Sequence, residues 1–317
     1  MEESIYNFPR QFAWNPEMVG AAYKKGIEKY IVVGMGGSHL AADLLSVTHP
    51  HLSIAVHKNY GLPFLSQKEI KKTLVILSSY SGNTEEVLDA FKKVRILGLK
   101  CAVTAMGGTL LTLAQKYAIP HVQLPDTGIQ PRMATGFSLK ALLKIMSDED
   151  ALKKTSELGE TLNAEDFRAR GRNIANMIKQ RIPVIYASES NFPLAYNSKI
   201  KFNETGKVPA FCNMLPELNH NEMTGFSESQ SVKKFCFILL KDAADHPRII
   251  KRMNILKRLL LKKGARVKTI DISHKNIWYK IFSTLLIADF AAYHVAKNLG
   301  HDPEDVPMVE EFKKMMQ

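Results

Sequence analysis

Hydroxyl side chains crowd a short turn between a predicted strand and a predicted helix. The apolar run Leu74–Leu77 is typical of a buried parallel strand, and helical apolar spacing begins after Thr84. The turn between them offers one glycine and several hydroxyls: Ser78, Ser79, Ser81, Gly82 and Thr84. Because a helix start leaves N–H groups unpaired and its dipole favours negative charge, this turn predicts an anion site. The turn has no lysine, so a small phosphate monoester fits better than a nucleotide triphosphate.

The same hydroxyls have a simpler alternative role, which is to cap the helix as Ser and Thr often do. Capping requires one hydroxyl, whereas this turn offers four within seven residues. The surplus favours a ligand.

A second small-residue turn, Gly34–His39, also follows a predicted strand and precedes a helix. It departs from the dinucleotide-binding pattern, because position 39 is histidine and no acidic residue ends the next strand, Ile54–Val56. Nicotinamide binding is therefore disfavoured. Gly37 would instead let the backbone approach a ligand closely, and Ser38 would donate to it.

Two further residues have the chemistry of proton transfer. Glu204 ends a helical pattern with Gly206 as its stop, so the helix dipole is expected to raise the pKa of the carboxyl towards that of a general base. A solvated surface glutamate is the commoner alternative. His220 lies in a polar segment, where it serves either as a proton shuttle for sugar ring opening or as an ordinary exposed side chain.

Composition limits the class of protein. A chain of 317 residues with 45% hydrophobic and 23% charged residues is typical of a globular protein of two domains. No apolar run reaches the roughly 20 residues that a membrane span needs, and the N-terminus lacks a secretory pattern. The three cysteines are scattered, so neither a disulfide framework nor a zinc site is predicted, and the cytoplasm is the default compartment. We expect His49, His51 and His57 to lie on the surface, because no carboxylate is near them in the sequence.

The net charge of +12 comes largely from residues 248–268, where lysine and arginine alternate with aliphatic residues at helical spacing. This pattern predicts an amphipathic helix with a basic solvated face. The segment has no interleaved aromatic residues, which disfavours a nucleic-acid surface. Its positive potential would help attract anionic substrates.

Strands and helices alternate along the chain and predict an α/β protein with two doubly wound parallel-sheet subdomains. The first, residues 1–147, has predicted strands at Tyr30–Val33, Ile54–Val56, Leu74–Leu77, Cys101–Thr104 and His121–Leu124. Residues 148–180 are predicted to form a helical connection. The pattern then restarts in residues 181–317, with predicted strands at Val184–Tyr186, Phe235–Leu240 and Val267–Ile272. The second half is therefore interpreted as a degenerate copy of the first.

Six motifs together resemble one family, the bifunctional phosphoglucose/phosphomannose isomerases of the sugar isomerase domain superfamily. They are Gly34–Ser38, Ser79–Glu86, the Pro131–Arg132 pair, Asn203–Ala210, Pro216–Glu222, and the C-terminal Asp302–Pro303 with Glu310–Lys313. The resemblance runs in order over essentially the whole chain. It implies two sugar isomerase subdomains and a homodimer that interconverts glucose 6-phosphate and mannose 6-phosphate with fructose 6-phosphate.

The resemblance also implies a role for each matched residue. Those expected to bind the sugar phosphate are Gly37, Ser38, Ser79, Ser81 and Thr84. Arg132 is similar to the arginine that steadies the enediolate, and Glu204 matches the base. His220 matches the ring-opening residue, reaching the site from the partner subunit, and Lys313 matches a lysine near the ring oxygen. No metal, nucleotide cofactor, nucleic acid or membrane is implied.

Two alternatives remain at this point. One is an isomerase of another sugar phosphate, such as arabinose 5-phosphate or an aminosugar phosphate. The other is a non-enzymatic sugar-phosphate sensor that regulates transcription, which needs a DNA-binding domain; no helix-turn-helix pattern precedes Tyr30.

Overall fold

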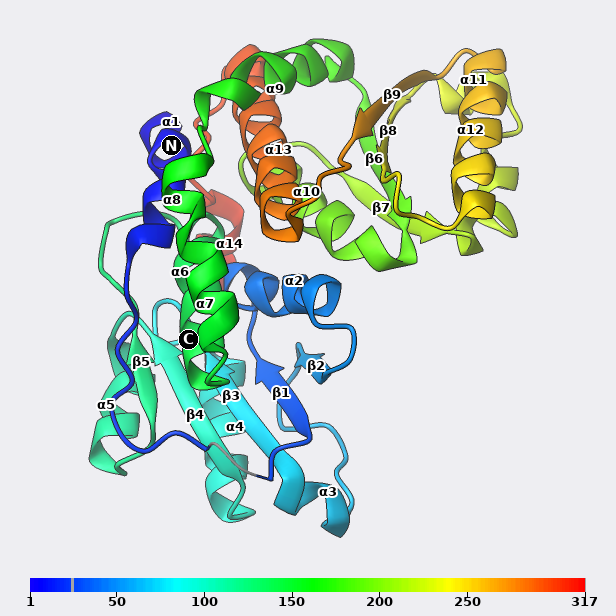
Figure 1. Ribbon diagram of the computed structural model, residues 1–317. Helices are drawn as coiled ribbons and strands as arrows, with labels where there is room; N and C mark the ends of the chain where they lie inside the picture. Colours follow the sequence, from blue (N-terminus) through cyan, green and yellow to red (C-terminus); the bar gives the residue numbers. More distant parts are fainter. Residues whose placement is uncertain (24–25, 317) are drawn as a thin grey trace. The chain divides into compact units, whose positions relative to one another are not determined.

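The computed structural model describes residues 1–23 and 26–316, with the backbone alone at Ser229. The chain forms two compact units (Figure 1). The first unit is Asn7–Leu162, and the second joins Met1–Tyr6 to the chain from Asn163 onward.

The first unit is built on a parallel sheet in the order β2-β1-β3-β4-β5. Its strands are β1 (Lys29–Val33), β2 (Ser53–His57), β3 (Thr73–Ser78), β4 (Lys100–Ala105) and β5 (His121–Gln123). Its α-helices are α2 (Leu40–Thr48), α3 (Gln67–Lys72), α4 (Glu85–Ile96), α5 (Gly108–Lys116), α6 (Thr135–Ile145), α7 (Glu149–Ser156) and α8 (Leu158–Thr161). Three 3-10 helices complete it: η1 (Phe8–Ala13), η2 (Gly36–His39) and η3 (Pro131–Met133).

Strand β3 lies at the centre of this sheet, and every one of its residues is buried. Alternate residues of the strands, Val75 and Leu77 among them, pack with the apolar faces of α4 and α5, for example with Val87 and Phe91. Burial on both faces explains why the strand is a continuous apolar run rather than an alternating one. The core therefore holds the carboxyl end of β3, where the hydroxyl turn begins, in a fixed place.

The second unit is built on a parallel sheet in the order β7-β6-β8-β9. Its strands are β6 (Ile182–Ser188), β7 (Phe211–Leu215), β8 (Phe235–Lys241) and β9 (Arg266–Asp271). Its α-helices are α1 (Glu2–Tyr6), α9 (Glu165–Ile178), α10 (Phe192–Glu204), α11 (Ser229–Val232), α12 (Pro247–Lys262), α13 (Ile277–Leu299) and α14 (Pro307–Met316). The 3-10 helices are η4 (Glu189–Asn191), η5 (Glu217–Asn219) and η6 (Glu222–Phe226).

Helices cover both faces of the second sheet. Figure 1 shows α12 on one face and α10 and α13 on the other. Val184 and Phe237 point to the α12 side, where they pack with Leu256, while their neighbours Ile185 and Ile238 point to the opposite side. This alternation is the two-residue period of a strand.

The predicted fold class is confirmed: the protein is α/β, with two doubly wound parallel sheets. The second sheet repeats the order of the first, since β7, β6, β8 and β9 take the places of β2, β1, β3 and β4. The sequence patterns did not predict strand β7 or the two short helices at residues 2–6 and 67–72.

The division between the units falls inside the predicted connection, residues 148–180. Helices α7 and α8 belong to the first unit, and α9 belongs to the second because it packs along α13. Met1–Tyr6 also joins the second unit, where the Glu2 carboxylate pairs with Arg168 at 3.5 Å. The helices of the predicted connection are therefore shared between the two units, because each amphipathic helix buries its apolar face within one of them.

Helix α13 is the longest helix, with 23 residues, and is largely buried. It contains Lys280 and Asp289, two buried charged residues. Within the described ranges, no helix has the length and apolar character needed to cross a bilayer.

Candidate active site

Two turns meet at the carboxyl ends of β1 and β3. The Ser78 hydroxyl donates to the Ser38 carbonyl at 2.7 Å, and the Tyr80 N–H donates to the Ser38 hydroxyl at 2.9 Å. A Cβ on Gly37 would lie 2.6 Å from the Arg132 nitrogen, so only glycine allows the third segment, η3, to approach. The turn after β1, the turn after β3 and η3 therefore converge in the first unit, as the parallel topology predicts.

The hydroxyls of the β3–α4 turn bond to one another rather than to the end of the helix. Ser79 Oγ and Thr84 Oγ1 lie 2.8 Å apart, and the Gly82 N–H donates to Ser79 Oγ at 3.0 Å. Thr84 is the residue preceding α4, but its side chain makes no capping hydrogen bond. The capping alternative therefore does not describe Thr84, and no Thr84 side-chain bond offsets the positive end of the α4 dipole.

A neighbouring loop fixes the shape of this turn. Gly82 has φ +73°, and a Cβ there would lie 1.8 Å from the Gly107 carbonyl oxygen. The Met106 N–H donates to the Tyr80 carbonyl at 3.0 Å. Ser81 lies on the exposed side of the turn, where its hydroxyl accepts from the Asn83 N–H at 3.2 Å. The turn is thus preorganised by the β4–α5 loop rather than left to form around a ligand.

Arg132 supplies a buried cation to the first unit. It is 1% exposed, and its Nη1 lies 3.5 Å from the Gln130 side-chain oxygen. A guanidinium is a five-donor cation that stays charged when buried, which suits an anionic ligand or intermediate. The contact of its backbone with Gly37 places it beside the turn after β1.

In the second unit, α10 ends at Glu204, as the sequence pattern predicts. The N–H groups of Thr205 and Gly206 both donate to the Lys201 carbonyl, at 2.9 and 3.0 Å. Glu204 itself is half-buried. The Lys207 ammonium donates to the Glu204 carbonyl and so brings positive charge to the negative end of the helix dipole.

A buried ion pair fastens the same helix one turn earlier. Lys201 Nζ lies 2.6 Å from Asp289 Oδ1 on α13, and both side chains are 1% exposed. Such a pair contributes less to stability than to a unique arrangement, because each charge is costly to bury without the other. It ties the last turn of α10, and with it Glu204, to the buried helix α13.

His220 lies on an exposed segment that is anchored by a neighbouring glutamate. The Tyr186 hydroxyl and the Asn213 amide both donate to the Glu222 carboxylate. Burial, followed by the hydrogen bond to Glu222, raises the pKa of Tyr186, so the phenol remains a donor. Glu222 was not among the predicted site residues, because its contacts with Tyr186 of β6 and Asn213 of β7 are visible only in the fold.

Lys313 lies on α14 and is exposed, with its ammonium 2.7 Å from the Glu310 carboxylate on the same helix. The nine predicted site residues are thus divided between the units. The first unit holds Gly37, Ser38, Ser79, Ser81, Thr84 and Arg132, and the second holds Glu204, His220 and Lys313.

The prediction that His49 lies on the surface without a carboxylate partner is wrong. His49 is 8% exposed, and its Nε2 lies 2.8 Å from Asp148, which is 99 residues away in the sequence. Asp148 is the residue before α7, and α7 packs on α6, which brings the two side chains together. Among residues 1–23 and 26–316, no group of three or more His, Cys, Asp or Glu side chains is arranged to hold a metal ion.

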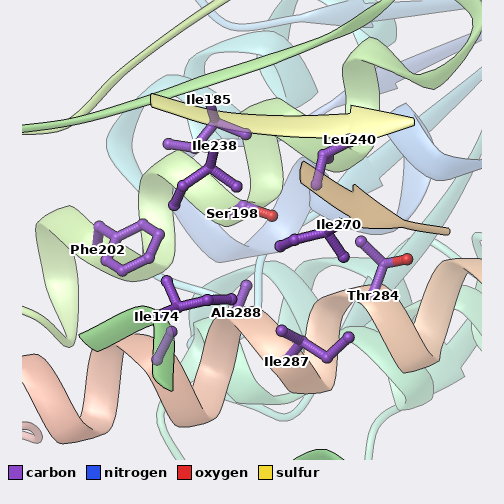
Figure 2. A pocket seen from close by; sticks show the side chains of 11 residues that line it. Ile174, Ile185, Ser198, Phe202, Ile238, Leu240, Ile270, Thr284, Ile287 and Ala288 are labelled. Carbon is purple, nitrogen blue, oxygen red and sulfur yellow. The ribbon is translucent and has the colours of Figure 1, made fainter. Parts of the chain in front are cut away.

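A small cavity in the second unit has no features of a substrate site (Figure 2). It has a volume of about 10 Å³ and is lined mainly by aliphatic side chains from the sheet, α9, α10 and α13. Its two hydroxyls already donate to backbone carbonyls at 2.7 Å, Ser198 to Leu194 and Thr284 to Lys280. A space that holds at most one water and lacks free polar groups is a packing gap.

Paired parallel sheets with a hydroxyl turn at a helix N-terminus define a class of fold, that of the phosphosugar isomerase domains. The chain matches the family model of the bacterial phospho-glucose isomerase C-terminal SIS domain over residues 167–316. Among solved structures it is similar to glucosamine-6-phosphate deaminase from Thermotoga maritima, with a TM-score of 0.70 and 16% identity over 96% of this chain and 97% of the other.

The sequences of curated proteins narrow the class to one family. The chain is 33% identical to a bifunctional phosphoglucose/phosphomannose isomerase from Aquifex aeolicus, over 98% of this chain and 96% of that relative. It is 30% identical to the protein of the same name from Caldicellulosiruptor bescii, over 100% and 98% of the two chains. It is also 27% identical, over 92% and 90%, to a D-glucosamine-6-phosphate 4-epimerase from Sulfolobus acidocaldarius. The chain belongs to the family of bifunctional phosphoglucose/phosphomannose isomerases, and it is an isomerase.

Proposed function

We propose that this enzyme interconverts glucose 6-phosphate and mannose 6-phosphate with fructose 6-phosphate through an enediol, without a metal ion. The observation that carries the proposal is the turn in which Ser79 and Thr84 bond to each other and leave the start of α4 uncapped by a side chain. A sugar phosphate has the charge and the size for this turn. Family membership supplies the reaction class.

In this proposal the phosphate binds to the turn residues of the first unit: Gly37, Ser38, Ser79, Ser81 and Thr84. His220 protonates the ring oxygen and opens the sugar, with Lys313 near that oxygen. Glu204 then removes the proton from C2 of the aldose and delivers it to C1, while the hydroxyl proton of O2 is transferred to O1, so the aldehyde becomes an alcohol and C2 becomes the ketone. The Arg132 guanidinium stabilises the negative charge that develops on the enediolate oxygen.

The proposal includes a homodimer in the cytoplasm, in which His220 of each subunit contributes to the active site of the partner subunit. The exposed position of His220 on its anchored segment is compatible with such a role. Mixing Glu204→Gln with His220→Ala under conditions of subunit exchange should then regenerate active sites in heterodimers. If mass spectrometry shows exchange and no activity returns, His220 acts within its own subunit or not at all.

A second candidate acts on an aminosugar phosphate. It is favoured by the similarity to the Sulfolobus acidocaldarius epimerase, whose name specifies D-glucosamine 6-phosphate. The two candidates share the phosphate turn and differ in the sugar that binds beyond it.

In the deciding experiment, the purified protein is incubated with fructose 6-phosphate in the presence of EDTA. Formation of both glucose 6-phosphate and mannose 6-phosphate is expected. Parallel reactions contain arabinose 5-phosphate or glucosamine 6-phosphate, and turnover of these alone would favour the second candidate. Activity lost in EDTA and restored by zinc would overturn metal independence, and binding without any turnover would indicate a sensor.

A further inference from the structure

The turn that follows Glu204 is strained at a lysine. Lys207 has φ +56°, a left-handed conformation that side chains other than glycine, asparagine and aspartate rarely adopt. Two hydrogen bonds join Val208, the residue after Lys207, to the last turn of α10. The Val208 N–H donates to the Phe202 carbonyl at 3.2 Å, and the Asn203 amide donates to the Val208 carbonyl at 3.0 Å. Backbone strain of this kind is retained when the surrounding structure requires it, and it often marks a functional position.

The strained backbone directs the Lys207 side chain onto two carbonyl groups. Its ammonium donates to the carbonyl of Glu204, at the end of α10, and to the carbonyl of Asp305, in the segment between α13 and α14. The two acceptors are about a hundred residues apart in the sequence, and both belong to the second unit. A single cation thus connects the helix end that carries Glu204 to residues 300–306.

Helix α14 depends on this segment for its position. None of its residues, which are all described, is buried, and Met308 and Phe312 are 82% and 63% exposed. The segment before it is held by the Lys207 bridge and by the N-terminal ammonium, which pairs with Glu304. Because α14 buries none of its residues, these polar contacts at residues 300–306 are observed anchors of the segment that leads to Lys313.

We propose that Lys207 is a positioning residue that clamps residues 300–306 onto the end of α10 and so holds Glu204 and the α14 lysine, Lys313, in place for proton transfer. The proposal rests on the assigned roles of Glu204 and Lys313. Unlike Glu204 and Lys313, Lys207 is assigned no contact with the substrate. The strain at Lys207 is then retained because only this backbone conformation directs the ammonium to both carbonyls.

The test uses Lys207→Gly, which removes the ammonium while adopting the left-handed conformation without strain. Lys207→Arg retains a cation of similar reach, and Lys199→Met removes a lysine from α10, the helix that precedes the strained turn. We expect kcat for fructose 6-phosphate to fall by about tenfold to a hundredfold in Lys207→Gly, with KM within about twofold, since a small misplacement of a catalytic group has effects of that order. Lys199→Met should match the wild type, and Lys207→Arg should recover part of the rate.

Amide hydrogen exchange provides the readout that does not depend on activity. In Lys207→Gly, exchange should accelerate in residues 301–316 while β6 and β8 keep their protection. Faster exchange with unchanged kcat would overturn the positioning role, and unchanged exchange would overturn the clamp. If the wild-type protein isomerises none of the sugar phosphates above, the proposed function fails, and the exchange measurement still decides whether the clamp exists.

Discussion

The two units share one strand order, but opposite kinds of side chain occupy their corresponding loops. After the third position in the first sheet, β3, the turn carries the hydroxyls of Ser79 and Thr84. After the equivalent strand of the second sheet, β8, the turn carries the carboxylates of Asp242 and Asp245. A phosphate would be attracted to the first turn and repelled from the second.

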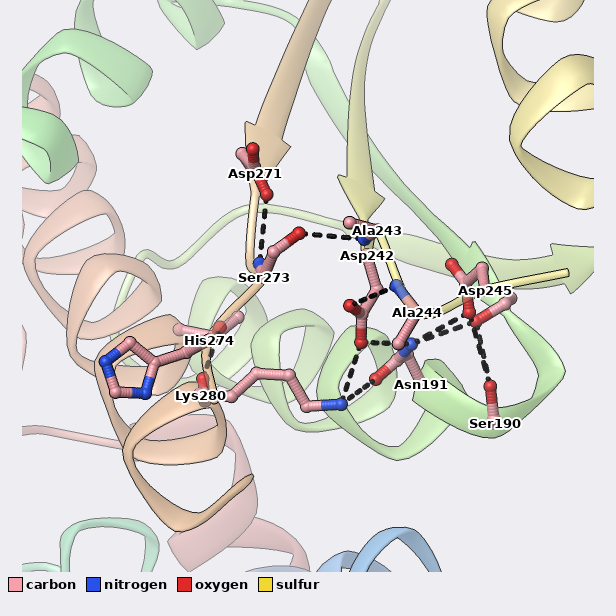
Figure 3. A network of polar contacts seen from close by, with 12 residues as sticks. Ser190, Asn191, Asp242, Ala243, Ala244, Asp245, Asp271, Ser273, His274 and Lys280 are labelled. Atoms are coloured by element: carbon pink, nitrogen blue, oxygen red, sulfur yellow. Dashed lines mark hydrogen bonds and ion pairs between the residues drawn. The ribbon is translucent and has the colours of Figure 1, made fainter. Parts of the chain in front are cut away.

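Both carboxylates of the second turn have hydrogen-bond partners within the protein (Figure 3), although Asp245 Oδ2 is buried without one among the described residues. Asp242 pairs with Lys280 of α13 at 2.8 Å, and Asn191 donates to Asp242 and Asp245 at 3.4 and 3.2 Å. The Lys280 ammonium also donates to the Asn191 side-chain oxygen at 3.1 Å. The Lys280 ammonium and the Asn191 amide are therefore already paired with the built-in carboxylate of Asp242, which disfavours a bound anion at this turn.

The helices after the first strand of each sheet differ in the same way. In the first copy α2 ends at Thr48, next to the His49–Asp148 pair, which is a structural contact. In the second copy α10 ends at Glu204, which is half-buried and lies beside Lys207. In the proposed mechanism the first copy supplies the phosphate turn and Arg132, and the second supplies Glu204, so proton transfer between the carbons is assigned to the second copy.

The largest effect is expected from Glu204→Gln, which retains shape and hydrogen bonding but removes the base. If the second copy supplies the chemistry, kcat should fall by about 10²–10⁴-fold with KM little changed. Both the glucose and the mannose activities should fall together, because a single base acts on the shared C2-centred enediol. Steady-state kinetics with each sugar phosphate measures this.

Exchange of the C2 proton of glucose 6-phosphate with deuterated water gives a direct control for that variant. It should disappear in Glu204→Gln and persist in the wild type. Survival of one activity in the variant would reveal a second base and break the division of labour between the two copies.

Asp242→Ala should produce the next largest effect, and it should act on stability alone. The change leaves Lys280, which is 8% exposed, without its carboxylate, and the loss of one partner of a buried pair costs about 3–5 kcal/mol. Urea unfolding can be followed for the second unit through Trp278 in a Trp14→Phe background, since these are the two tryptophans of the chain. Competition by inorganic phosphate should be unchanged, because the phosphate turn lies in the other copy.

The matched control replaces both members of the pair, as Asp242→Leu with Lys280→Met. Removing both charges should restore most of the lost stability, because neither remains buried alone. If the single and double variants are equally destabilised, the pair is not what stabilises this loop.

The sequence was sufficient to predict helices and strands whose apolar residues follow one clear pattern. Strand β3 is a continuous apolar run that is buried on both faces, so it was predicted close to its true bounds. The strand β7 was missed because it is an edge strand of half-exposed residues, with Asn213 in the middle. Its identity comes from its pairing with β6 rather than from its own composition.

The candidate site divides along the same line. The hydroxyl turn after β3 could be predicted because all its groups are consecutive in the sequence. Contacts between distant residues could not be, and these include Lys207 with Asp305, Tyr186 with Glu222, and His49 with Asp148. Such pairs depend on the tertiary packing of helices, for which one sequence carries no local signal.

Thr84→Ala tests the first copy with a smaller expected effect. The change removes one hydroxyl donor to a dianion, worth about 1.5–3 kcal/mol, so KM for fructose 6-phosphate should rise by about tenfold or more. Thr84→Ser keeps the hydroxyl and is the matched control. An unchanged KM, together with loss of competition by inorganic phosphate, would place the phosphate elsewhere.

The smallest effect is the pH dependence of the stability that the Asp242–Lys280 pair gives to the second copy. Burial by itself acts to raise the pKa of Asp242, but the Lys280 ammonium, the Ala244 N–H and the Asn191 amide together hold it below its ordinary value. The stabilisation is therefore complete above the unfolded-state pKa of about 3.9 and is lost as the pH falls through the folded-state pKa. The gap in unfolding free energy between wild type and Asp242→Asn should be widest near about pH 7 and narrow below about pH 4.

Urea unfolding at several pH values measures that gap, with Thr84→Ala as the companion variant. Thr84 does not titrate, so the stability gap of Thr84→Ala should stay constant over the same range. If the differences in unfolding free energy of both variants narrow together at low pH, acid weakens the whole fold rather than the Asp242 pair. If only the Asp242→Asn gap narrows, the second copy is stabilised by an ionised carboxylate, where the first copy depends on neutral hydroxyls that remain available to a phosphate.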